Sequence, residues 1–116
     1  MPVTMICLGV KDPARSIKFY GETLRLQLVG QPGEVTLFQA GPIQIALNHP
    51  LGKHAGDAIT GAVEVVFSVA SVRASFEMLA GRGCAFLQEP REVFPGTWGA
   101  TLTDPDGHKL TLLGAP

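Results

Sequence analysis

Glu64 is the residue of this sequence whose position most suggests chemistry, because it interrupts the apolar run Ala62-Val63-Glu64-Val65-Val66-Phe67. A carboxylate inside such a run is costly to bury unless it has a partner. Glu64 therefore pairs with an arginine, with backbone amides or with water, or it meets a ligand that is cationic or donates hydrogen bonds. We favour the ligand interpretation, and Glu64 is also a candidate general base.

The histidines and cysteines form no recognisable site. His49 and His54 lie in a segment rich in Pro, Gly and Lys, and His108 follows a turn, so all three are typical of solvated side chains. Cys7 and Cys84 are far apart and lack metal-type spacing, which predicts buried free thiols. The sequence also lacks the phosphate-loop, dinucleotide-binding and nucleophile-elbow motifs.

Aromatic residues offer a second candidate surface. Trp98 is the only tryptophan, and with Phe38 and Phe94 it either belongs to the core or forms a wall on which a planar ligand stacks. The sequence leaves both interpretations open.

Hydrophobic periodicity predicts the elements that position these residues. In the first half, Val3–Val10 alternates like a strand, and a helix begins at the cap Asp12 and Pro13 and ends near Leu26. Turn residues then separate three further strands. These strands are expected at Leu26–Gly30, Glu34–Ala40 and Ile43–Asn48.

The second half repeats this order at an offset of 59 residues. A strand containing Val65, Phe67 and Val69 precedes a helix that is capped by Ser71 and ends at Gly81 or Gly83. The remaining strands are expected near Ala85–Gln88, Thr97–Thr103 and Lys109–Leu113. The chain is thus predicted as one α+β domain over residues 1–116, with βαβββ modules at 3–49 and 62–114 and an irregular surface linker at 50–61.

Strand parity divides the side chains of each module between two faces. If Ile6, Leu8 and Val10 face the helices, the residues between them face the opposite way. That second face is predicted to carry Met5, Cys7, Gly9, Gln44, Ala46, Asn48, Glu64, Val66, Ser68, Thr111 and Leu113.

Composition excludes several classes of partner. The 116 residues carry nine basic and ten acidic side chains with no run of either sign, so neither nucleic acid nor an anionic membrane surface is an expected partner. Only 16% of residues are charged, against roughly 25% usually, so we expect a homodimer that covers apolar surface. Met1–Val10 resembles neither a signal peptide nor a membrane span, which predicts a cytoplasmic protein.

Two segments carry a family resemblance: GVKDPARSIKFYGETLRLQLV, with Asp12, Ser16, Phe19-Tyr20 and Leu24, and WGATLTDPDGHKLTLL, with the turn Asp104–Gly107. The chain resembles the vicinal oxygen chelate superfamily of glyoxalases, bleomycin-resistance proteins and extradiol dioxygenases. The resemblance implies that the two modules form a cupped mixed sheet, with helices on the outer face, that is often completed across a dimer.

The enzymes of this superfamily hold a divalent metal on the inner face of the cup, and the sequence departs from their ligand pattern. Met5 stands where a His is usual, Thr111 where a Glu is usual, and Ala46 offers no ligand atom. Only Glu64, where the family often has His, carries a donor for such a metal. One carboxylate and one thioether do not hold a divalent ion against water. The sequence thus predicts no metal and no other cofactor.

The favoured function is therefore a metal-free small-molecule binding protein, similar to bleomycin-resistance proteins, for an aromatic or partly cationic compound. The expected ligand-binding residues are Met5, Phe38, Asn48, Glu64, Trp98 and Thr111. One alternative is a metal-dependent glyoxalase-type lyase, isomerase or extradiol-type dioxygenase, since a one-residue slip of register would change which side chains face the cup. A second alternative is a dimerisation module whose cup is filled by its own side chains.

Overall fold

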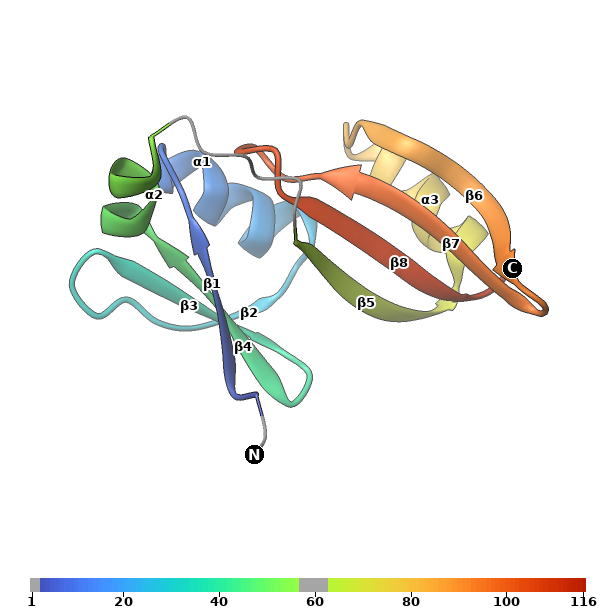
Figure 1. Ribbon diagram of the computed structural model, residues 1–116, viewed down its shortest axis with the longest axis horizontal. Coiled ribbons are helices and arrows are strands. Elements are labelled where there is room, and N and C mark those ends of the chain that lie inside the picture. The colour runs from blue at the N-terminus through green and yellow to red at the C-terminus, as the bar shows by residue number, and fades with distance from the viewer. Residues whose placement is uncertain (1–2, 57–62) are drawn as a thin grey trace. The chain divides into compact units, whose positions relative to one another are not determined.

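A computed structural model of the chain describes residues 3–56 and 63–116 and divides it into two compact units, Met1–Ala58 and Ile59–Pro116 (Figure 1). Within the described residues, each unit contains one four-stranded mixed sheet. The order strand, helix, strand, strand, strand occurs in both units. The predicted α+β class with two βαβββ modules is confirmed.

The first unit builds its sheet in the order β1-β4-β3-β2, in which β1 is parallel to β4 and the other pairs are antiparallel. Its elements are β1 (Met5–Gly9), α1 (Pro13–Lys18), the π-helix η1 (Phe19–Thr23), β2 (Gln27–Gly30), β3 (Val35–Ala40), β4 (Ile43–Asn48) and α2 (His49–Ala55).

The first helix begins as predicted and ends earlier. The Asp12 side chain accepts a hydrogen bond from the Arg15 amide at 3.3 Å, and Pro13 occupies the first turn. The expected single helix to Leu26 is instead α1 followed by the wider turn η1, in which the Leu24 amide bonds to the Phe19 carbonyl at 2.9 Å. Within η1, Tyr20 is fully buried beside Phe38. The change from the α-helix α1 to the wider π-helix η1 thus occurs where Tyr20 packs against Phe38.

Residues 49–55 correct the prediction of an irregular linker over 50–61, because they form the helix α2. The Asn48 side chain caps this helix by accepting a hydrogen bond from the Leu51 amide at 2.8 Å. Gly52 packs directly on the end of β1, where a Cβ atom would overlap the backbone of Val10. Because α2 is held here by a contact between backbone atoms, it needs no stripe of apolar side chains. The sequence therefore shows no helical periodicity in this segment. Residues 57–61 of the expected linker lie outside the described residues.

The second unit repeats the arrangement with the sheet order β5-β8-β7-β6, in which β5 is parallel to β8 (Figure 1). Its elements are β5 (Glu64–Ser71), α3 (Val72–Gly81), β6 (Phe86–Phe94), β7 (Thr97–Thr103) and β8 (Lys109–Ala115). Ser71 caps α3 as predicted, since its hydroxyl accepts from the Ala74 amide at 3.1 Å. The strand expected near Ala85–Gln88 is longer, because irregular pairing with β7 carries β6 on to Phe94.

Each sheet buries the side chains that alternate toward its helix. In the first unit these include Leu8, Val10, Phe38, Ile45 and Leu47, and in the second they include Val65, Ala100, Leu102, Leu110 and Leu112. The opposite sides of the two sheets are named here by one residue each. The Met5 face is the side of the first sheet that carries Met5 and Cys7, and the Glu64 face is the side of the second sheet that carries Glu64 and Thr111.

No helix in the described parts of the chain combines the length and the apolarity that crossing a membrane requires.

Candidate functional site

Three polar side chains join across the Glu64 face. The Thr111 hydroxyl of β8 donates to Glu64 Oε2 of β5 at 3.0 Å, and the hydroxyls of Thr111 and Thr101 of β7 lie 3.0 Å apart. Strand pairing explains the geometry, because Thr111 pairs with Val66 on one side and with Thr101 on the other. Glu64 is the diagonal neighbour of Thr111 on the same face. These three residues are called the Glu64–Thr111–Thr101 chain.

The hydroxyls in this chain have a defined direction of donation. Each hydroxyl has one proton, and an ionised carboxylate only accepts hydrogen bonds. Because the Thr111 hydroxyl already donates its hydrogen bond to Glu64, the Thr101 hydroxyl must be the donor in its hydrogen bond to Thr111. Glu64 Oε1, in contrast, bonds to none of the residues that the structure describes. The chain thus orients a carboxylate and leaves one of its oxygens available to an incoming donor.

An apolar strip lies beside this polar chain. Val66 of β5 is 53% exposed, Leu113 of β8 pairs with Gly99 of β7, and Val93 of β6 lies over the same glycine. A Cβ atom at Gly99 would lie 3.1 Å from Leu113 Cδ2 and 3.2 Å from Val93 Cγ1, so the missing side chain lets these two groups approach each other. The apolar strip, which consists of Val66, Leu113, Gly99 and Val93, supplies contact area without hydrogen-bonding groups.

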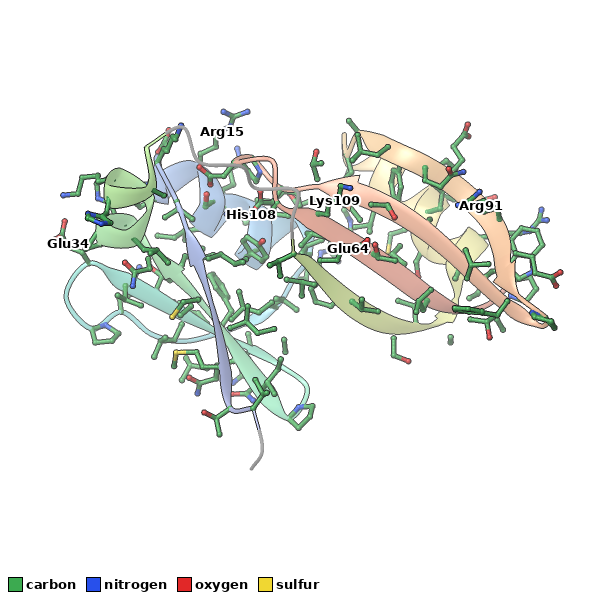
Figure 2. The ribbon with its side chains drawn as sticks, viewed as in Figure 1. Arg15, Glu34, Glu64, Arg91, His108 and Lys109 are labelled. Carbon is green, nitrogen blue, oxygen red and sulfur yellow. The ribbon has the colours of Figure 1, made fainter. Side chains whose placement is uncertain are left out.

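Two positively charged residues flank these groups on the same face of the sheet. Lys109 of β8 pairs with Glu64, and Arg91 of β6 pairs with Gly99 (Figure 2). The carboxylate of Glu64 therefore stands next to a position that carries an ammonium group. The Glu64 face combines acceptor, donor and apolar groups on one exposed surface.

The Met5 face has a different character. Met5 and Cys7 are exposed neighbours on β1, and they pair with Gln44 and Ala46 of β4. Cys7 corrects the prediction of a buried thiol, because its side chain is exposed on β1 although its strand partner Ala46 is buried. Asn48 belongs to the same face, but its side-chain oxygen is engaged as the cap of α2.

Phe38 and Trp98 lie on the helix-facing sides of their sheets. Phe38 is 1% exposed, and its ring centroid is 6.3 Å from that of Tyr20. Trp98 has the parity of the buried Ala100 and Leu102, and the Arg73 guanidinium of α3 lies 4.6 Å from its ring centroid. Of the two interpretations that the sequence left open, these positions favour the core. Phe94, at the end of β6, is 64% exposed.

The donor sets that the structure describes on the Glu64 face and on the Met5 face do not fit a divalent metal. Among residues 3–56 and 63–116, no three His, Cys, Asp or Glu side chains come together as a possible metal site. On the Glu64 face the carboxylate is joined by hydroxyls, and on the Met5 face the nearest donors are a thioether and a thiol. Mg²⁺, Mn²⁺, Fe²⁺ and Zn²⁺ require more oxygen or nitrogen ligands than either set supplies.

Sequence analysis missed several contributors to the Glu64 face, and for Gly99 and Thr101 of β7 the signal lay in strand alternation. In the strand Thr97–Thr103, Thr101 stands between Ala100 and Leu102, both of which are buried. A small-to-bulky alternation of this kind places Gly99 and Thr101 on the face opposite the core. Their partners on β6 and β8 were not readable from the sequence, because register is a property of the folded sheet.

Solved structures with this fold extend over nearly the whole chain. A glyoxalase/bleomycin resistance protein/dioxygenase from Nocardioides shares 19% identity with a TM-score of 0.84, over 99% of this chain and 83% of its own. TnmS3, an antibiotic binding protein from Streptomyces sp. CB03234, shares 22% identity with a TM-score of 0.82, over 100% and 97% of the two chains. A glyoxalase-related enzyme from Fulvimarina pelagi shares 25% identity with a TM-score of 0.80, over 99% and 88%.

None of the curated proteins compared with the chain matches it in sequence. A family model does match, and it spans residues 3–112. The repeated βαβββ modules and this match lead to one assignment: the chain belongs to the Glyoxalase/Bleomycin resistance protein/Dioxygenase superfamily.

Proposed function

We propose that this chain binds a small organic molecule without the help of a divalent metal and that the Glu64 face is its recognition surface. The observation that supports this proposal most directly is the Glu64–Thr111–Thr101 chain. It holds one carboxylate oxygen and leaves the other available beside the apolar strip, of which Val66 and Val93 are exposed. A surface of this kind suits a ligand that has both an apolar body and a hydrogen-bond donor.

Support for a binding function comes from the relatives. TnmS3 is described as an antibiotic binding protein and has the same fold over the full length of this chain. Resemblance of fold alone does not specify a reaction, because related scaffolds host unrelated chemistries. The donor sets of the Glu64 face and the Met5 face therefore carry more weight for this chain. Among the described residues they contain no group of three carboxylate, imidazole or thiol ligands, which supports binding without a divalent metal.

The chemistry of the Glu64 face narrows the class of ligand to aromatic or partly cationic compounds. A planar ring gains contact area on Val66, Leu113 and Val93. An amine on that ring has an acceptor in Glu64 Oε1. The other expected binding residues lie away from the Glu64 face. Met5 and Asn48 are on the Met5 face of the first sheet. Phe38 and Trp98 are on the helix-facing sides of their sheets.

The test compares two planar probes that differ in charge, aminoacridine as the cation and acridine carboxylic acid as the anion. We expect Glu64→Gln to weaken aminoacridine binding about two- to fivefold, which lies within the range for an exposed ion pair, and to leave the anion unweakened. Glu77→Gln is the matched control, because Glu77 is an exposed carboxylate on α3. Isothermal titration calorimetry measures both probes with the wild type and with each of the two variants.

Two results would contradict the proposal. The first is aminoacridine binding that is absent, or that is equally strong in the wild type, Glu64→Gln and Glu77→Gln. The second is lactoylglutathione formation or aromatic ring cleavage that a chelator abolishes and added metal restores. That second result would establish the metal-dependent alternative.

A further inference from the structure

Two sulfur atoms lie together on the Met5 face. The Cys7 thiol points at Met5 Sδ, with the sulfur atoms 3.9 Å apart. The two residues are separated by one position on β1, so their side chains share a face. Met5 is 40% exposed and Cys7 is an exposed free cysteine, so both residues lie at the surface of the first unit.

We propose that Met5 and Cys7 bind a soft monovalent metal ion, Cu(I), through the thioether and the thiolate. Thiolate and thioether sulfur are the ligands that select Cu(I) over harder ions. An ion about 2.3 Å from each sulfur, a typical metal–sulfur distance, would subtend an angle of roughly 115° between them. Such an angle is close to trigonal and leaves the third position open to a small external thiol.

Binding is accompanied by the loss of one proton. The Cys7 thiol releases its proton to solvent as the sulfur–copper bond forms, and the copper remains Cu(I) throughout. No oxidant or reductant takes part. The net charge of the site is unchanged, because one proton leaves the Cys7 thiol and one monovalent copper ion takes its place.

The neighbours of the sulfur pair disfavour harder divalent metals. Met5 pairs with Gln44, Cys7 pairs with Ala46, and Ala46 pairs with Leu37 of β3. None of these three side chains is a carboxylate or an imidazole, which harder divalent ions require. The inference rests on the first unit alone, so it is independent of the ligand proposal for the Glu64 face.

The chain contains a matched control for each sulfur ligand. Cys84 is a half-buried thiol, and Met78 is a thioether on α3 that is 48% exposed. The experiment adds Cu(I) alone to the reduced, untagged protein under anaerobic conditions and competes it with the chelator bathocuproine disulfonate. Thiolate-to-copper absorption in the ultraviolet reports on the bond to Cys7.

We expect one equivalent of Cu(I) in the wild type, in Cys84→Ser and in Met78→Leu. Cys7→Ser should lose the tight site together with the absorption band. Met5→Leu should keep the band and weaken the affinity at least about tenfold, since one of two sulfur donors is gone. Zn²⁺ in equal amount should not displace the bound ion.

The proposal is overturned if Met5→Leu binds Cu(I) as tightly as the wild type, because an isolated thiol would then explain the binding. It is also overturned if Cys84→Ser, rather than Cys7→Ser, removes the site. Circular dichroism of each variant separates a lost site from a lost fold. Should Cu(I) binding fail, the aminoacridine titration still tests the Glu64 face separately.

Discussion

At the scale of single residues, Glu64 illustrates how a carboxylate is accommodated on an otherwise apolar strand. Its hydrogen-bond partner Thr111 is 47 residues away in sequence, and Thr101 extends the chain by one more strand. The apolar run around Glu64 indicated that this carboxylate needs a partner or a ligand. The identity of that partner depends on the pairing of β5 with β8, which no local pattern encodes.

The two cysteines should differ in their reactivity toward iodoacetamide. Burial raises the pKa of the Cys84 thiol, and the nearby Arg82 charge opposes this shift. A raised pKa lowers the thiolate fraction at neutral pH, and the thiolate is the form that reacts. We expect mass spectrometry of the folded protein at pH 7 to show Cys7 alkylated before Cys84, with the Cys84 rate still rising as the pH passes the ordinary thiol pKa.

Removal of the positive charge in Arg82→Ala should slow Cys84 further and leave the Cys7 rate unchanged, because the Arg82 charge lowers the pKa of Cys84. Urea-unfolded protein provides the control, since both thiols are then equally exposed. Equal alkylation rates in the folded state would contradict this expectation.

At the scale of elements, α2 shows how a short helix is held by close approach rather than by an apolar stripe. Its cap is the Asn48 side chain, and Gly52 lies against the backbone of Val10. Gly9 contributes from the other side, because a Cβ atom there would be 3.1 Å from Gly52 Cα. Two glycines therefore allow α2 to pack on the end of β1.

Gly52→Ala should destabilise the protein, because the added methyl group would overlap backbone atoms that cannot rotate away. Overpacking of this kind costs about 1–3 kcal/mol. Gly81→Ala is the matched control, because nothing lies within 4 Å of a Cβ atom built at Gly81, and its φ is not positive. Urea denaturation followed by circular dichroism should give a lower midpoint for Gly52→Ala and an unchanged or slightly higher one for Gly81→Ala. Equal midpoints for the two variants would show that α2 does not depend on this contact.

At the scale of the whole molecule, the chain consists of two units that each bury their own apolar side chains. Each unit also keeps large apolar side chains exposed, among them Leu28 and Val29 in the first and Leu87 and Phe94 in the second. With only 16% charged residues, the chain has little polar surface to surround them.

We therefore expect a homodimer in solution. Light scattering coupled to gel filtration should give a mass of twice the 12.3 kDa chain, and the mass should stay constant over a wide range of loading concentrations. A mass of 12.3 kDa at every concentration would contradict the prediction and would leave the exposed apolar residues to be explained by another partner.

The sequence alone determined the features that depend on a few neighbouring residues. Apolar runs between turn residues and the internal repeat identified the strands Ile43–Asn48 and Thr97–Thr103 with their observed limits. The caps Asp12 and Ser71 located the starts of the two main helices. Such signals are local, because the periods of strands and helices repeat within four residues. The family resemblance was likewise carried by short segments that lie in the sequence itself.

Only the tertiary structure decided which residues meet across strands. The donation from Thr111 to Glu64, the position of Trp98 beneath Arg73, and the packing of α2 on Val10 all depend on register or on backbone contact. A single step of register turns every side chain of a strand to the other face. Long-range pairing, rather than residue type, therefore determines which groups form a site.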